Sequence, residues 1–574
     1  MSAETIVIWG AGRIGRGFLA ELFADAGYRI VLVDQSEALV ERLRGRGQYT
    51  VVHAMGADRR EYRAISGYGA LTTAEGEEVA AAVASADLMA VAVFPKDMVA
   101  VAEEMVPGLL RRREERPGEP LDIILCANVA HPGPQFRSDL AAALPLEARS
   151  WAESQVGIVE SLVIRMVAEP PAEELARHPL LVWTNGYGEF PVERRAFRCG
   201  VPPVPALRPV EDMRAEETRK LYTYNTFHAA LAYLGALRGH ESVVDCLGDP
   251  WMRETAEGAL REAALAVQVA YGYGEDEMVR WIEGVVVQTD NAALRDTVAR
   301  FGRDPRRKLR RGDRLVGPLL LAGGHGLETP NLVLAVGAAL LYEDAGDAGA
   351  CHVHQQVQDR GVEEAVRELC GLGDAEAGVI GEIALATRRL PLESEWAGRA
   401  EQAYRLGFAY EQRYHGCGQC VLAAVHDAAG LFDEVAFHGA FEAATGLAGG
   451  VGLCGDGTCS ALTSGALALG LYSPRRRAQF DGDRDNKYRA YDLIQRLRER
   501  VLSAYSSTRC HDIHRHELGR AFDLRDPAER QAFEDAGAHG SKCTGVVARA
   551  AQWTVEIIGV EEVRRALGSE GRAG

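Results

Sequence analysis

The segment 5–34 constrains the fold more than any other part of the chain. The apolar run TIVIW, residues 5–9, leads into a turn with glycines at positions 10, 12 and 15, and a helical pattern follows. A second apolar run, YRIVLVD at 28–34, ends in Asp34. Short apolar runs bounded by glycine are typical of buried strands, and the order strand–helix–strand favours a parallel pairing. The sequence therefore predicts a parallel α/β sheet.

The glycine spacing G-x-G-x-x-G, placed after a strand and before a helix, indicates a dinucleotide-binding turn. The first glycine permits the tight turn, the second lets the backbone approach a pyrophosphate, and the third lets the helix pack on the strand. Amides at the helix N-terminus attract the phosphates. Asp34 would accept hydrogen bonds from the ribose and repel a 2′-phosphate, so we expect NAD rather than NADP. The cofactor residues predicted here are Gly10, Gly12, Arg13, Ile14, Gly15 and Asp34.

The character of the sequence changes twice along its 574 residues. Strand-like runs recur at 87–94 and 121–128, whereas the pattern is almost wholly helical from about 205 to 390. The helical periodicity breaks near Pro391, where we expect a linker, and six of the 11 cysteines follow it. We predict three domains: an α/β Rossmann domain at 1–204, an all-α substrate domain at 205–390, and a mainly α-helical cysteine-rich domain at 396–574.

The charge balance limits the partners. With 64 Lys and Arg against 82 Asp and Glu, the formal net charge is −18, which is a poor match for nucleic acid or an anionic membrane. A small anionic substrate needs only a local positive pocket and stays compatible. There is no apolar run of the roughly 20 residues that span a bilayer, and no secretory signal pattern, so we expect a cytoplasmic protein. Cysteines in that compartment are more often reduced, metal-bound or redox-active than structural.

The segment KLYTYNTFHAALAYLG, residues 220–235, places Lys220, Asn225 and His228 in an otherwise apolar helix. At about 100° per residue, the three side chains lie within an arc of about 140°. A neutral lysine can take the proton of an alcohol while an amide and an imidazole hold the oxygen. Burial and the adjacent Arg219 are expected to lower the lysine pKa from about 10.4. The alternative is an ordinary helix with a solvated lysine, a capped asparagine and a core histidine.

Five segments that occur in order carry a family resemblance: IVIWGAGRIGRGF, WAESQVGIVESLVIRMV (151–167), the 220–235 helix, RDPRRKLRRGDRLVGP (303–318) and LETPNL. Over residues 1–390 they resemble the long-chain, metal-independent polyol dehydrogenases, and among these most closely the mannitol-1-phosphate 5-dehydrogenases. The resemblance implies NAD-dependent interconversion of a polyol or polyol phosphate with its ketose. It also implies that Lys220 is the general base with Asn225 and His228 as partners, and that Asn128 lies near the nicotinamide or substrate.

The chain departs from this family at positions that bear on the substrate. Phe227 stands where glycine is usual beside the histidine, Ile164 where an acidic residue is usual, and Glu160 where aspartate is common. The basic run 303–314 is interpreted as a structural element on the surface, or else as a site for a substrate phosphate. Two other functions stay open: a β-hydroxyacid dehydrogenase, and a non-catalytic NAD-sensing protein with the cysteine region as its output.

Four later segments carry a second resemblance: HGCGQCVLAAV, GLAGGVGLCGDGTCSALTSGALALGL (446–471), TRCHDI and SKCTGVVARAAQW. They resemble the C-GCAxxG-C-C family, which is described as redox-active, over about 396–565. The family's cysteine positions are occupied by Cys417, Cys459, Cys510 and Cys543. The resemblance implies redox chemistry or metal binding at these four residues.

Three interpretations of the cysteines stay open. Four thiolates from separate segments suit a tetrahedral metal ion or an iron–sulfur cluster. The close pairs formed with Cys420 and Cys454 suit thiol–disulfide exchange. The third interpretation is a set of small buried residues. The histidines at 511, 514 and 516 are expected to form a solvated helix face.

Overall fold

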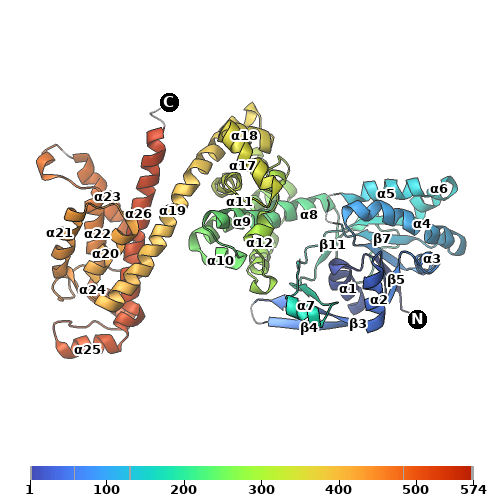
Figure 1. Cartoon of the computed structure of the whole chain (residues 1–574), viewed down its shortest axis with the longest axis horizontal. Coiled ribbons are helices and arrows are strands. Elements are labelled where there is room, and N and C mark those ends of the chain that lie inside the picture. Colours follow the sequence, from blue (N-terminus) through green and yellow to red (C-terminus); the bar gives the residue numbers. More distant parts are fainter. Residues whose placement is uncertain (1–2, 57–58, 128, 130, 483, 571–574) are drawn as a thin grey trace. The chain divides into compact units, whose positions relative to one another are not determined.

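The structure is a computed structural model that describes residues 3–56, 59–127, 129, 131–482 and 484–570 (Figure 1). Its internal contacts divide the chain into two compact units, Met1–Ile383 and Ala384–Gly574. Among the described residues, no helix combines the length and apolar character needed to span a lipid bilayer.

The first unit begins with a six-stranded parallel sheet in the order β5-β2-β1-β6-β7-β8. Its strands are β1 (Thr5–Trp9), β2 (Arg29–Asp34), β5 (Gly69–Thr72), β6 (Leu88–Val91), β7 (Leu121–Leu125) and β8 (Val156–Glu160). This confirms the predicted parallel sheet. The strand order reverses between β1 and β6, and such a switch point at the carboxyl ends of the strands is where ligands of this fold bind.

Helices cover both faces of this sheet: α1 (Ala20–Asp25), α2 (Glu37–Arg46), α3 (Gly76–Ser85), α4 (Met98–Glu115), α5 (Pro132–Ala143) and α6 (Leu146–Gln155). One core gathers Phe18 and Phe23, and a second gathers Met105 and Phe136. Because the sheet is buried on both sides, its strands read as continuous apolar runs rather than as alternating patterns.

A second sheet in the first unit was not predicted. It has the order β4-β3-β10-β9, from β3 (Gln48–Met55), β4 (Arg59–Ser66), β9 (Val167–Ala168) and β10 (Val182–Thr184). A further parallel pair joins β11 (Phe190–Glu193) to β12 (Leu207–Val210), and helix α7 (Ala172–Arg177) lies between β9 and β10 in sequence. The residues of β4 are almost all exposed, and β9 and β10 are very short. Their sequences therefore contain neither the apolar run nor the alternating pattern from which a strand is predicted.

The rest of the first unit is helical, as predicted. Helix α9 (Asn225–Leu237) is buried along most of its length and packs against α11, α13 and α16. The helices are α8 (Met213–Arg219), α10 (Val243–Gly248), α11 (Pro250–Tyr271), α12 (Glu275–Thr289), α13 (Val298–Gly302), α14 (Pro305–Lys308), α15 (Val316–Gly324), α16 (Pro330–Leu340), α17 (Ala348–Arg360) and α18 (Val362–Cys370).

The predicted linker is instead part of a helix. Helix α19 (Ala377–Tyr414) runs through Pro391. A proline inside a helix removes one hydrogen bond and costs about 3 kcal/mol. Apolar side chains are buried on both sides of it, including Ile383 and Leu390 before and Ala400 and Ala403 after, and their burial offsets that cost.

The second unit is also helical. After α19 it contains α20 (Cys417–Ala429), α21 (Glu434–Ala443), α22 (Ser460–Tyr472), α23 (Arg484–Tyr505), α24 (Cys510–Leu518), α25 (Pro527–Asp535) and α26 (Cys543–Glu570). Its core is built from α20, α22, α23 and α26, with Val421, Leu469 and Val555 fully buried. The predicted helical cysteine-rich region is confirmed.

Candidate active site and cysteine cavity

The glycine turn after β1 has the shape that a dinucleotide requires. Gly10 has a φ of +93°, and a Cβ there would lie 2.5 Å from the carbonyl oxygen of Ala92. A Cβ on Gly15 would lie 1.9 Å from the carbonyl oxygen of Gly10. A Cβ on Gly12 would meet no described atom within 4 Å, which leaves open space beside the backbone where a pyrophosphate would approach.

Asp34 holds this turn in place. Its carboxylate accepts hydrogen bonds from the backbone amides of Ala11 and Ser36, both at 2.8 Å. Arg13 is exposed and pairs with Glu169. Arg16 is buried and donates to the carbonyls of Ala11 and Leu180. Arg16 is therefore structural, whereas the predicted contacts of Arg13 and Ile14 with a cofactor stay predictions.

Lys220 begins a π-helical turn, Lys220–Tyr224, between α8 and α9. Such turns are rare and often occur at functional sites. The Nζ atom donates a hydrogen bond to the carbonyl of Val163 at 2.6 Å. Burial, aided by the positive charge of Arg314, lowers the pKa of Lys220 to about 8, although Glu217 acts in the opposite direction. The predicted lowering of this pKa therefore has a physical cause in the structure.

The predicted role of Arg219 is wrong. Its guanidinium lies 4.2 Å from the ring centroid of Trp281 and pairs with Glu216 at 2.6 Å and with Glu277 at 2.5 Å. Neighbouring residues of a helix point in directions about 100° apart, so sequence adjacency did not bring this cation to Lys220. The cation that lowers the pKa of Lys220 is instead Arg314, from a distant segment.

His228 is held as a neutral imidazole. Its ring stacks on Phe301 with centroids 4.0 Å apart, and Nε2 lies 3.1 Å from the hydroxyl of Thr289. Burial, together with Arg314 and other cations, places the pKa of His228 well below its ordinary value. Because the Thr289 hydroxyl already donates to the carbonyl of Val285, it accepts from Nε2, and the lone pair of His228 is on Nδ1.

Asn225 and His228 are half-buried on a helix whose neighbouring residues are buried, as expected for a face that borders an open site. The backbone amide of Asn225 donates to the carbonyl of Lys220, whereas its side-chain amide has no hydrogen-bond partner among the described residues and is available to a ligand. Phe227 is fully buried, with 0% exposure. Asn128, the remaining predicted cofactor residue, lies outside the described residues.

The basic run 303–314 is not wholly a surface element. Lys308 is buried, and its ammonium donates to the carbonyl of Phe301 and lies 5.4 Å from the ring centroid of Tyr233. Lys308 and Arg314 both lower the pKa of His228, so part of this run borders the candidate site. The surface interpretation is therefore wrong for these two side chains.

Sequence reasoning missed a polar network next to Lys220. The Nδ1 atom of His131 lies 3.0 Å from the buried carboxylate of Glu160, and its backbone amide donates to Glu217 at 3.3 Å. Glu217 is three residues before Lys220 and raises the pKa of that lysine. Among the departures from the family pattern, Glu160 belongs to this network, but only the fold brings His131 and Glu217 together.

The four motif cysteines line one cavity of about 230 Å³ in the second unit. Each stands at the N-terminal end of a helix: Cys417, Cys510 and Cys543 begin α20, α24 and α26, and Cys459 immediately precedes α22. Helix N-termini carry partial positive charge and favour thiolates. Burial opposes them and raises the thiol pKa values, that of Cys417 to about 12. The predicted set is therefore brought together.

Backbone contacts bring two of these segments together. The amide of Cys459 donates to the carbonyl of Thr508 at 2.7 Å, and the amide of Cys510 donates to that of Gly457 at 3.0 Å. The glycine-rich loop wraps closely around α24, since a Cβ on Gly455 would lie 1.7 Å from Nε2 of His511. The glycines of the motif therefore let the loop close over the cysteines.

The two extra cysteines of the second unit do not line this cavity, although the thiol of Cys420 lies next to Cys417 and Glu411, which do. Cys420 is buried and donates to the carbonyl of His415, whereas Cys454 is exposed, and neither lines the cavity. His514 corrects the predicted solvated face, because it is only 3% exposed, lines the cavity and places Nε2 3.5 Å from the sulfur of Cys510. One of the three histidines, His514, was thus assigned to the wrong face of α24.

The cavity sulfurs are spaced widely. Among the described residues, no three of the four sulfur atoms lie within 4.8 Å of one another. In a tetrahedral zinc site, Zn–S bonds of about 2.3 Å place the sulfurs about 3.8 Å apart. The arrangement is therefore wider than the ligand shell of a single zinc ion.

Three segments of the chain match models of known protein families. Residues 4–205 match the model of the mannitol dehydrogenase Rossmann domain, and residues 212–383 match that of the mannitol dehydrogenase C-terminal domain. Residues 415–557 match the C-GCAxxG-C-C model, whose description proposes a redox-active protein.

Solved structures share the fold of the first unit. A substrate-free D-sorbitol dehydrogenase is 16% identical with a TM-score of 0.58, over 67% of this chain and 92% of that one. Mannitol 2-dehydrogenase from Pseudomonas fluorescens, solved as a ternary complex with NAD and D-mannitol, is 18% identical with a TM-score of 0.52, over 68% and 91%. At these identities the likeness shows the fold.

Proposed function

The chain belongs to the mannitol dehydrogenase family over residues 4–205 and 212–383, and from this premise we propose the activity of its first unit. The unit interconverts a polyol, or a polyol phosphate such as mannitol 1-phosphate, with the corresponding ketose, using NAD. The observation that carries this proposal is the half-buried Lys220, with its pKa lowered to about 8 beside Arg314 and a neutral His228.

The residues of the glycine turn fit the cofactor. The open space at Gly12 would admit the pyrophosphate, and Asp34 closes the second strand where the ribose would lie. NAD bound at this turn would supply the acceptor for the hydride of the carbinol carbon. The protein has to bind the substrate, orient it and take its proton.

The proton of the substrate hydroxyl passes to the neutral amine of Lys220. Its hydrogen bond to the Val163 carbonyl orients Nζ and leaves the nitrogen lone pair for this proton. The amide N–H₂ of Asn225 is suited to donate to the oxygen that becomes the ketone. Because Nδ1 of His228 carries a lone pair, the imidazole is suited to accept a hydrogen bond from a neighbouring substrate hydroxyl.

Arg314→Gln tests this electrostatic arrangement. Alcohol oxidation needs the neutral amine, so kcat/KM rises with pH through an apparent pKa of about 8. Removing the nearby cation stabilises the protonated lysine, so the pKa rises toward the ordinary value and the profile moves to higher pH. The exposed Arg303→Gln in the same basic run is the control and leaves the profile in place. An unmoved profile in Arg314→Gln contradicts the assignment.

The second unit is proposed to hold an iron–sulfur cluster between its four motif cysteines. They line one cavity, they begin or precede four helices, and they are spaced more widely than the ligands of one zinc ion. Four cysteine thiolates are the usual ligands of such a cluster, which supplies one-electron chemistry when bound. The residues of the cavity would bind it and exclude water.

Anaerobic reconstitution with iron and sulfide tests this second role. We expect the full chain to take up iron and sulfide in a fixed ratio with visible absorption, and Cys510→Ser to lose this uptake. Cys454→Ser, which changes an exposed cysteine outside the cavity, retains it. Absence of uptake in the wild type, with a disulfide between Cys417 and Cys420 found by mass spectrometry, would instead support thiol–disulfide exchange.

A further inference from the structure

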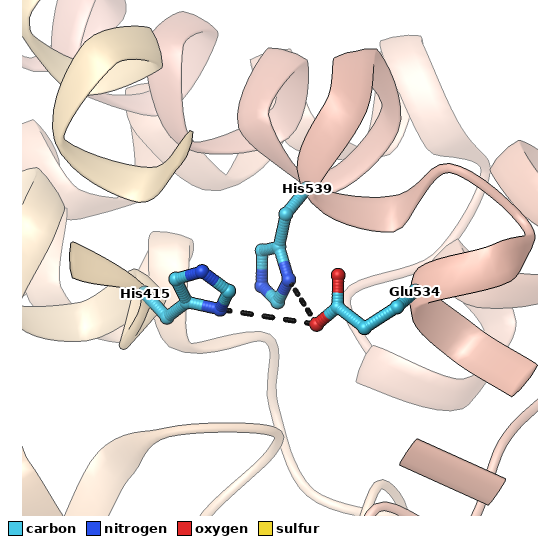
Figure 2. Close-up of side chains that lie close together, drawn as sticks. All are labelled: His415, Glu534 and His539. Carbon is cyan, nitrogen blue, oxygen red and sulfur yellow. Dashed lines mark hydrogen bonds and ion pairs between the residues drawn. The ribbon is translucent and has the colours of Figure 1, made fainter. Parts of the chain in front are cut away.

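Three polar side chains from separate segments meet at the border of the cysteine cavity (Figure 2). His415 follows α19, Glu534 lies near the end of α25, and His539 lies in the π-helical turn Ala538–Lys542 that precedes Cys543. One nitrogen or oxygen atom from each lies within 4.8 Å of the other two. Among the described residues, this is the one group of three potential metal ligands with that spacing.

We propose that His415, Glu534 and His539 bind a divalent transition-metal ion, in a site distinct from the four cysteines. Figure 2 shows a ring nitrogen of each histidine directed at the same carboxylate oxygen. Nδ1 of His415 lies 3.8 Å from Oε1 of Glu534, and Nδ1 of His539 lies 2.6 Å from it. Ligands about 2.0–2.1 Å from one ion lie about 3.3 Å apart, so small side-chain movements admit an ion between them.

A buried carboxylate, that of Glu411, lies next to the ring nitrogen of His539 that does not face Glu534. Glu411 is 2% exposed, and its Oε1 lies 3.5 Å from Nε2 of His539, the nitrogen opposite to the one that faces Glu534. Histidines that bind a metal almost always donate their other ring N–H to such a carboxylate, carbonyl or water, which fixes the tautomer and raises the basicity of the ligand. Glu411 therefore serves as a positioning residue.

The same carboxylate has a second oxygen that lacks a partner. Oε2 of Glu411 is buried without a hydrogen bond, although Glu411 lines the cavity. The nearby thiol of Cys420 donates to the carbonyl of His415. A buried carboxylate oxygen without a partner is costly. An ion bound to His539 brings positive charge close to this carboxylate and lowers the cost.

The donor set selects the kind of ion. Two imidazoles and one carboxylate suit zinc or ferrous iron, whereas calcium and magnesium prefer oxygen ligands alone. Three protein ligands leave coordination positions open, and the side chains of His415 and Glu534 are 50% and 40% exposed, so solvent or a small anion can complete the shell. The bound ion would then border the cavity that the cysteines line.

Titration of the full chain with cobalt(II) tests the proposal, after chelator treatment and under a reducing atmosphere. Nitrogen and oxygen ligands give weak visible absorption, whereas thiolate ligands add intense charge-transfer absorption in the near ultraviolet. We expect one equivalent of cobalt(II) to bind with the weak visible absorption of nitrogen and oxygen ligands. His415→Gln and His539→Gln remove this absorption, and Glu411→Gln weakens binding by about 10–100-fold.

Two controls make the outcome decisive. His438 forms an exposed pair with Glu434 at 3.6 Å on the same unit, so His438→Gln changes a surface histidine outside the site and leaves cobalt binding unchanged. Cys417→Ser leaves the weak visible absorption unchanged, because no thiolate takes part. The proposal fails if the wild type binds no cobalt of this kind, if both histidine variants retain it, or if Cys417→Ser removes it. His415 is exposed, so that variant keeps the test valid even where His539→Gln destabilises the fold.

Discussion

Lys220→Ala is expected to lower kcat for polyol oxidation by about 10²–10⁴-fold, the range associated with loss of a general acid–base group. The other lysine whose charge acts on His228, Lys308, is buried at 4% exposure against Phe301, whereas Lys220 is half-buried. The dissociation constant for NAD should stay unchanged, because the glycine turn lies elsewhere. Steady-state kinetics and NAD binding by calorimetry measure the two effects separately.

A second variant distinguishes proton transfer by Lys220 from the effect of its positive charge. Lys220→Arg keeps a positive charge but cannot lose its proton near neutral pH, so it should be as inactive as Lys220→Ala. Small alkylamines should restore part of the rate to the alanine variant only. A rate within about 10-fold of wild type in either variant excludes Lys220 as the base.

Glu21→Leu is expected to lower the free energy of unfolding of the first unit by about 3–5 kcal/mol. The carboxylate of Glu21 accepts from Arg165 at 2.6 Å and lies 2.8 Å from Nε2 of His53, and all three side chains are buried. Replacing Glu21 leaves the Arg165 guanidinium buried without its carboxylate. Urea unfolding, followed by hydrogen exchange of peptides from the first unit, gives the change.

The exposed pair between Asp25 and Arg63, at 2.6 Å, provides the matched control. Asp25→Leu should cost less than about 1 kcal/mol, because solvent screens the pair. Although burial alone would raise the pKa of Glu21, its bonds with His53 and Arg165 lower it on balance. The stabilisation is therefore present at neutral pH and lost as the pH falls through the lowered pKa. Equal losses in both variants would contradict the role assigned to burial.

The elements that the sequence predicted correctly are those that depend on residues close together in the chain. The strand–turn–helix at 5–34 and the polar face at 220–235 depend on neighbours in sequence, and the structure confirms the parallel sheet and the helix. Each of the four cysteines begins or precedes a helix, but their meeting in one cavity depends on how these helices pack. The linker predicted at Pro391 was wrong, because the cost of a proline inside a helix is outweighed by the burial of apolar side chains before and after it.

Long-range contacts account for what the sequence did not predict. Arg314 reaches Lys220 from a distant segment, whereas the adjacent Arg219 turns away toward Trp281. Strand β4 is held by backbone hydrogen bonds to β3, while almost all its side chains are exposed. Its sequence therefore shows no apolar pattern. His415 and His539 carry no recognisable spacing, since they come from segments that only the packed helices bring together.

Reduction of NAD by the purified full chain, on a panel of polyols and polyol phosphates, tests the central claim most directly. The account predicts NADH formation with at least one member of the panel, at a rate that rises with pH around 8. It also predicts NADH consumption with the matching ketose. Tight NAD binding without turnover of any polyol, polyol phosphate or ketose would contradict the claim and favour an NAD-sensing protein.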